Sequence, residues 1–197
     1  MPSDRRSLEP RDDILYAAAV QITLSIAVYI YLGAFSAILF VGLAVATFAL
    51  WRHFGFGARM DRGFTVPAML GLMALQLLAY AEMVAFDFAG QAAARFPALF
   101  NGATPFNEYA FVIAFPLTTM SVTMFAAIAL LRDRPIATYV FLFNLLWALS
   151  LGVLIYGAAL VDPLRMLPGF GSIWLPFGAA IFILRALKER RNEASRA

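Results

Sequence analysis

One acidic residue, Glu82, lies well inside a long apolar segment, and its chemistry stands out from the rest of the chain. The segment, FTVPAMLGLMALQLLAYAEMVAFDF, covers residues 64–88. As a helix it would be roughly 37 Å long, which is enough to cross the hydrocarbon core of a bilayer. A carboxyl group at that depth is costly, so we expect the Glu82 side chain to face protein or water rather than lipid.

Further polar side chains accompany Glu82 at helical spacing. Gln76, Tyr80 and Asp87 follow one another along a stripe of the same predicted helix. With the membrane topology derived below, two more acidic residues, from other predicted helix ends, fall toward the same outer side. We therefore predict an acidic vestibule that faces outward and binds a small cationic or neutral solute or protons, formed by Glu82, Asp87, Glu108, Tyr80, Gln76 and Asp162.

Each of these residues also has a structural interpretation. Asp87, Glu108 and Asp162 are of a type common at solvated helix ends. Glu82 can instead form a structural pair with Arg95, Arg165 or a tyrosine hydroxyl. Carboxylates inside membrane spans are enriched in functional sites, but they also occur in structural pairs. The sequence leaves both interpretations open.

A second group of polar residues continues inward. Thr119 and Thr123 lie four residues apart in one predicted helix, and Asn144 lies in the next. They either extend a polar track from the vestibule or form hydrogen bonds that join helices, and the second role is the commoner one in membrane bundles.

The composition indicates a membrane protein and excludes several kinds of site. Of 197 residues, 62% are hydrophobic and 14% are charged, whereas soluble domains average about 45–50% and about 25%. The absence of cysteine excludes disulfides and thiolate chemistry, and a single histidine, His53, cannot form a His-rich metal centre. We predict no catalytic residue, metal or cofactor. The basic residues lie beside apolar spans, so no nucleic-acid partner is expected.

The predicted fold class is all-α, a polytopic membrane bundle of six transmembrane helices. The apolar run from residue 14 to 51 would be roughly 57 Å long as one helix, so it is divided at Gly33 into two spans. Residues 1–13 are expected to form an exposed tail and residues 188–197 a basic tail. The predicted spans are residues 14–32, 35–52, 64–88, 108–131, 136–161 and 171–187.

The distribution of basic residues fixes the predicted orientation. With the N-terminus inside, only Arg95 and Arg165, of 15 lysines and arginines, fall in outer loops. This asymmetry follows the positive-inside rule and predicts cytoplasmic termini in a bacterial-type inner membrane.

Three functions remain open. The first is a unit that binds small solutes, ions or protons and lets them permeate. For this function we expect a homo-oligomer, because six short helices enclose little volume. The second is a non-catalytic subunit or assembly partner of a larger membrane complex. The third is a lipid-active enzyme with Glu82 as general acid or base.

Overall fold

The computed structural model describes residues 10–54, 61–87, 90–91, 94, 97, 101–102, 108–132, 134, 136–161 and 172–194. Within these residues the chain is all-helical, and each of the six predicted helices is present. The helices are α1 (Pro10–Leu32), α2 (Ala34–Phe54), α3 (Arg62–Ala85), α5 (Glu108–Leu131), α6 (Ile136–Val161) and α7 (Trp174–Ala194).

α5 and α6 have the predicted bounds. The other helices differ: α2 covers residues 34–54 rather than 35–52, α3 begins at Arg62 rather than at residue 64, and α7 begins at Trp174 rather than at residue 171. α1 begins at Pro10 rather than at residue 14, since proline is tolerated at a first helical position. α3 ends at Ala85 rather than at residue 88. α7 continues to Ala194, well beyond the predicted end at residue 187, because Arg185 pairs with Glu189 one turn later and Arg190 contacts α3.

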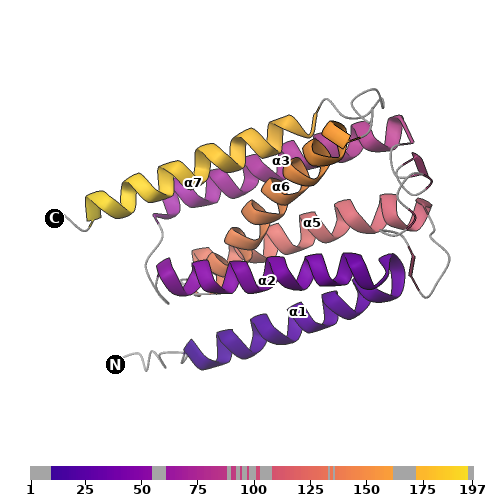
Figure 1. Ribbon diagram of the computed structural model, residues 1–197. Coiled ribbons are helices and arrows are strands. Elements are labelled where there is room, and N and C mark those ends of the chain that lie inside the picture. Colours follow the sequence, from indigo (N-terminus) through magenta and orange to yellow (C-terminus); the bar gives the residue numbers. More distant parts are fainter. Residues whose placement is uncertain are drawn as a thin grey trace.

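The helices run alternately in opposite directions along the bundle (Figure 1). α1 begins and α7 ends at one end, which we call the basic end because Arg52, Arg62, Arg132, Lys188 and Arg190 lie there. α6 passes through the centre and contacts each of the other five helices of the described chain. α1 packs mainly on α2, and α3 packs between α5 and α7. The core is densest along α6, where Phe141, Leu142 and Leu145 are completely buried.

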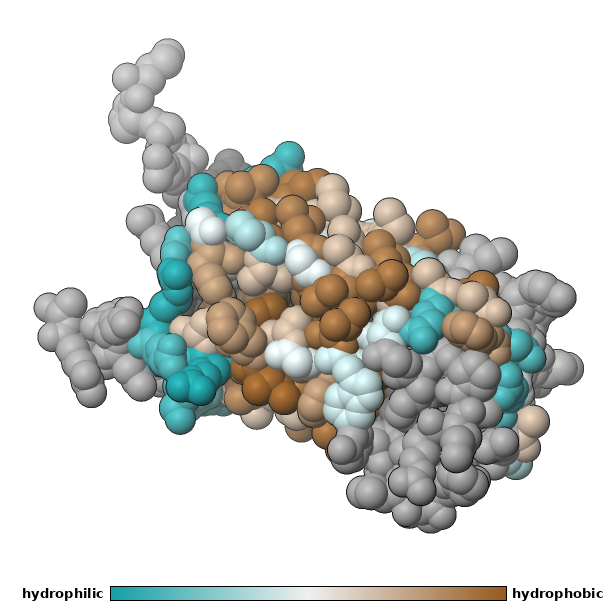
Figure 2. Space-filling view, turned by 90° about the horizontal axis from the view of Figure 1, so that it is seen from above, coloured by the Kyte–Doolittle hydropathy of each residue, from teal (hydrophilic) through white to brown (hydrophobic). Residues whose placement is uncertain are grey.

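The surface of the bundle is suited to lipid. Figure 2 shows hydrophobic residues over the middle of the visible face and hydrophilic residues gathered at the basic end. Large apolar side chains such as Ile38, Val45 and Phe182 are more than half exposed. Among the described residues, three helices are long and apolar enough to cross a membrane: Ala34–His53, Arg62–Ala85 and Ile136–Val153. A surface of this kind in water would be an extensive hydrophobic patch, so a bilayer is its natural solvent.

Gly33 separates α1 from α2, as predicted. Its φ of 95° lies in the left-handed region, which glycine adopts without strain. A Cβ at this position would lie 2.3 Å from the carbonyl oxygen of Asn101, so the loop backbone approaches the turn closely. The break at Gly33 therefore gives α1 and α2 opposite directions and holds the Asn101 segment against their turn.

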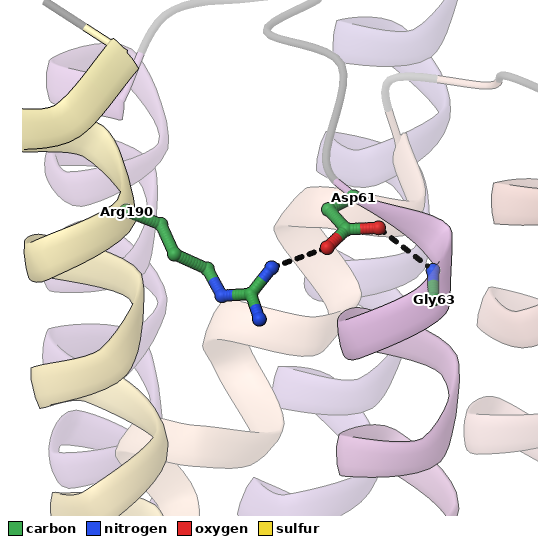
Figure 3. Close-up of polar contacts among 3 residues, drawn as sticks. All are labelled: Asp61, Gly63 and Arg190. Atoms are coloured by element: carbon green, nitrogen blue, oxygen red, sulfur yellow. Dashed lines mark hydrogen bonds and ion pairs between the residues drawn. The ribbon is translucent and has the colours of Figure 1, made fainter.

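Charged residues join α3 to α7 at the basic end. The Asp61 carboxylate caps α3 by accepting a hydrogen bond from the Gly63 N–H at 2.9 Å, and its other oxygen pairs with Arg190 of α7 (Figure 3). The Arg190 guanidinium also lies 4.4 Å from the centre of the Phe64 ring. The two contacts of Arg190, with Asp61 and with Phe64, thus fix the end of α7 beside the start of α3.

Candidate functional site

Glu82 joins the same two helices at the opposite end of the bundle. Its Oε2 atom accepts a hydrogen bond from the Ser172 N–H at 2.6 Å and another from the Ser172 hydroxyl. Ser172 lies two residues before α7, where exposed N–H groups and the helix dipole favour a negative charge. The Glu82 side chain therefore holds the residues just before α7 against α3.

Asp87 has a different position, just beyond the end of α3. Its φ is 53°, a left-handed conformation that aspartate tolerates better than most residues, and its side chain is exposed. The Asp87 N–H donates to the Val84 carbonyl at 3.2 Å, so the residue helps to terminate the helix. In this geometry Asp87 ends α3 rather than contributing to an enclosed site.

Gln76 and Tyr80, one turn apart on α3, line the same cavity between α3, α6 and α7. The cavity leaves about 10 Å³ open to the centre of a water-sized molecule. Both residues are buried, with Gln76 only 2% exposed. The other walls are apolar and come from Ala79, Met83, Ala148, Leu151, Ile173 and Pro176.

A glycine sets the spacing of the helices beside this cavity. Gly152 of α6 faces the Phe177 ring of α7, and a Cβ on Gly152 would lie 2.2 Å from a ring carbon. Leu151 and Pro176, the preceding residues on each helix, both line the cavity. The absence of a side chain at Gly152 therefore brings the two cavity walls together.

Tyr80 connects the cavity to the neighbouring helices. Its hydroxyl accepts a long hydrogen bond of 3.4 Å from the indole N–H of Trp147 on α6 and is also hydrogen-bonded with Thr119 on α5. One turn farther toward the basic end, the Asn144 amide donates to the Thr123 hydroxyl at 2.9 Å. The polar residues of α5 and α6 thus join helices, which is the structural role that the sequence allowed for them.

The contacts described above do not include the two remaining predicted site residues, Glu108 and Asp162. Glu108 is the first residue of α5, but its side chain lies outside the described part of the structure. Asp162 lies outside the described residues, as do Arg95 and Arg165, the two arginines considered as partners of Glu82. The described residues therefore bring together Gln76 and Tyr80 in one cavity, with Glu82 bonded to Ser172 at its α7 side.

Two participants were not anticipated as such from the sequence, Ser172 as the partner of Glu82 and Trp147 as the partner of Tyr80. Ser172 carries a usable signal, because serine shortly before an apolar helix is typical of an N-terminal cap. Trp147 carries none, since an indole in an apolar helix is equally typical of packing.

The described residues contain no group of three histidine, cysteine, aspartate or glutamate side chains that could hold a metal ion. The chain matches no protein-family model, no curated protein and no solved structure.

Proposed function

We propose that this chain crosses a bacterial-type inner membrane six times and binds a small solute, an ion or a proton between α3, α6 and α7, allowing its permeation. The observation that carries the proposal is Gln76. Its side chain is 2% exposed and lines the cavity, and in the described part of the chain neither its amide nitrogen nor its amide oxygen has a hydrogen-bond partner. A polar group of this kind in an apolar helix is costly unless it serves a ligand or a pathway.

The proposed orientation of the protein in the membrane follows from the distribution of charge. Basic residues gather at the end where α7 finishes, and the positive-inside rule places such an end in the cytoplasm. The cavity lies toward the other end, because Tyr80 and Met83 belong to the last two turns of α3 and Ile173 precedes α7. A solute would then enter from the outer side, past the contact between Glu82 and Ser172.

Flux measurements test this function directly. The purified protein is reconstituted into liposomes, and the entry of urea, water and protons is followed by stopped-flow light scattering and an enclosed pH-sensitive dye. We expect at least one probe to cross faster than in protein-free liposomes. Replacing Gln76 with leucine should slow that probe, because it removes both polar atoms from the cavity wall.

A matched control uses the lipid-facing side of the same helix. Leu78 is about half exposed and does not line the cavity, so Leu78→Ala should leave the flux unchanged. Equal rates in protein-free and protein-containing liposomes for every probe would remove the proposal and favour an assembly role. If Gln76→Leu and Leu78→Ala changed the flux equally, the flux would not pass through this cavity.

A further inference from the structure

The ligand chemistry of the cavity is limited by its size. About 10 Å³ is open to the centre of a water-sized molecule, which is close to the minimum that a single water requires. A larger organic solute does not fit without movement of the surrounding helices. The cavity as formed is therefore sized for one molecule of about the dimensions of water.

The lining groups determine which small molecule suits the cavity. Gln76 offers both a carbonyl acceptor and an N–H donor, each buried and without a hydrogen-bond partner among the described residues. Tyr80 supplies the other polar group of the lining, and its oxygen is already engaged by the Trp147 indole. A ligand must therefore be able to donate and accept at the same time.

Charge argues against a cation in this position. None of the residues lining the cavity carries a carboxylate, and the Glu82 carboxylate is directed to Ser172. Metal cations such as Ca²⁺ and Mg²⁺ require several oxygen ligands at once, whereas the lining offers the Gln76 carbonyl and the Tyr80 hydroxyl. The geometry thus favours a neutral ligand over the cations that the sequence also allowed.

We propose that Gln76 binds one buried water molecule, which donates to its amide carbonyl and accepts from its amide N–H within the cavity between α3, α6 and α7. This proposal rests on the proposed binding site and narrows its ligand from a solute, ion or proton to a neutral molecule of water's size. Buried waters typically make about three hydrogen bonds to polar groups that otherwise lack partners, which is the situation of Gln76.

Radiolytic hydroxyl-radical labelling followed by mass spectrometry detects a bound water of this kind and does not depend on an assay of transport. Millisecond irradiation generates radicals from bound water and modifies the side chains beside it. Tyr80 is the reporter, since it is buried and lines the cavity. Phe141 is the internal control, because it is completely buried in the core and does not line the cavity.

In the reconstituted wild-type protein we expect Tyr80 to be labelled well above Phe141. Gln76→Leu should reduce the Tyr80 labelling to the Phe141 level by removing the hydrogen-bonding amide. Ala148→Val should do the same by filling the cavity from α6 while leaving Gln76 in place, so it serves if the first variant does not fold. Circular dichroism establishes that each variant keeps its helices.

Two results overturn the water site: wild-type Tyr80 labelled no more than Phe141, or Tyr80 labelling unchanged in both folded variants. Flux is measured separately on the same samples. Flux without Tyr80 labelling would support the proposed permeation and contradict the proposed water site. Labelling that depends on Gln76 without any flux would support the water site and remove permeation.

Discussion

The Glu82 carboxylate has two hydrogen-bond donors from a residue 90 positions away, the N–H and the hydroxyl of Ser172. Hydrogen bonds to an ionised acceptor are about twice as strong as neutral ones. Both are accepted by the same oxygen at the N-terminal side of α7. The carboxylate thus contributes to the packing of α3 and α7 whether or not it also contacts a solute.

Replacing Glu82 tests this contribution. In Glu82→Gln the amide oxygen can still accept both hydrogen bonds, so unfolding should become easier by only about 1 kcal/mol. Glu82→Ala strands the Ser172 N–H and hydroxyl and should cost about 2 kcal/mol or more. Both values are measurable by reversible unfolding in mixed micelles of mild detergent and SDS.

A double-mutant cycle with Ser172→Ala supplies the control. Ser172→Ala removes the hydroxyl but keeps the backbone N–H, so the coupling with Glu82→Ala should be about 1 kcal/mol. A coupling near zero would mean that the hydroxyl contact contributes nothing to the stability of the bundle.

Asp61 offers a second prediction, in which a cap and an ion pair can be separated. Asn is as good a cap as Asp but cannot pair with Arg190, and both charged side chains are about half exposed. Asp61→Asn should therefore cost less than about 1 kcal/mol, the range of exposed ion pairs. Asp61→Ala also loses the bond to the Gly63 N–H and should cost about 1 kcal/mol more.

Salt provides the check on Asp61. High ionic strength screens an exposed pair, so the cost of Asp61→Asn should shrink in concentrated salt while the additional cost of Asp61→Ala persists. If salt abolished both differences, the hydrogen bond to Gly63 would have no measurable role in capping α3.

The sequence identified Glu82 and the Gln76–Tyr80 stripe because a polar residue in an apolar span is conspicuous by itself. It could not identify what these residues contact. Ser172 and Trp147 come from other helices, and their distances from Glu82 and Tyr80 depend on how three helices pack. Contacts of this kind follow from tertiary structure, which the local pattern does not contain.

At the scale of the helices, the turn between α1 and α2 depends on one residue. Gly33→Ala would force a side chain into a left-handed conformation and against the Asn101 carbonyl. We expect a loss of stability of about 2 kcal/mol or more, combining backbone strain and overpacking. Thermal unfolding in detergent, followed by circular dichroism, measures this loss.

Gly42 is the matched control, since it lies inside α2 with open space around its Cβ position. Gly42→Ala should be neutral or stabilising by up to about 1 kcal/mol, because alanine is the better helix former. Equal effects of the two substitutions would show that the turn does not require glycine.

The existence of the six helices was predictable because their apolar stretches are long and the loops between them are polar or rich in glycine and proline. The ends were less predictable. α7 extends to Ala194 through a charged stretch, ERRNEA, that reads as a solvated tail when its partners are unknown. The contacts of Arg190 with Asp61 and Phe64 involve residues that the sequence places far away.

For the whole molecule, the sequence does not indicate which helices are neighbours. Ala44 is buried and Val45 is exposed, although both are apolar residues of α2. Lipid and protein interior are equally apolar, so hydrophobicity does not distinguish the two faces of a membrane helix. Some polar residues do mark the buried face, as Gln76, Thr119 and Thr123 show, whereas Thr23 and Ser121 are exposed.

The orientation of the bundle in the membrane gives the prediction at the largest scale. The chain contains no cysteine, so single cysteines can be introduced as reporters. If the basic end is cytoplasmic, a cysteine at exposed Arg132 should resist a membrane-impermeant maleimide in intact cells and react in inverted vesicles. A cysteine at exposed Ala34, beside the α1–α2 turn, should show the reverse pattern.

Position 45 supplies the control. Val45 is exposed in the middle of α2 and should lie in lipid. The thiol of a cysteine introduced there would not ionise, so it would not react with maleimide. A cysteine there should therefore be labelled from neither side. The alternating directions of the helices put the turn at Arg132 and the turn at Gly33 at opposite ends of the bundle. Labelling of both Arg132 and Ala34 positions from the same side would contradict the six-span arrangement, and reversal of both would keep the spans but invert the protein.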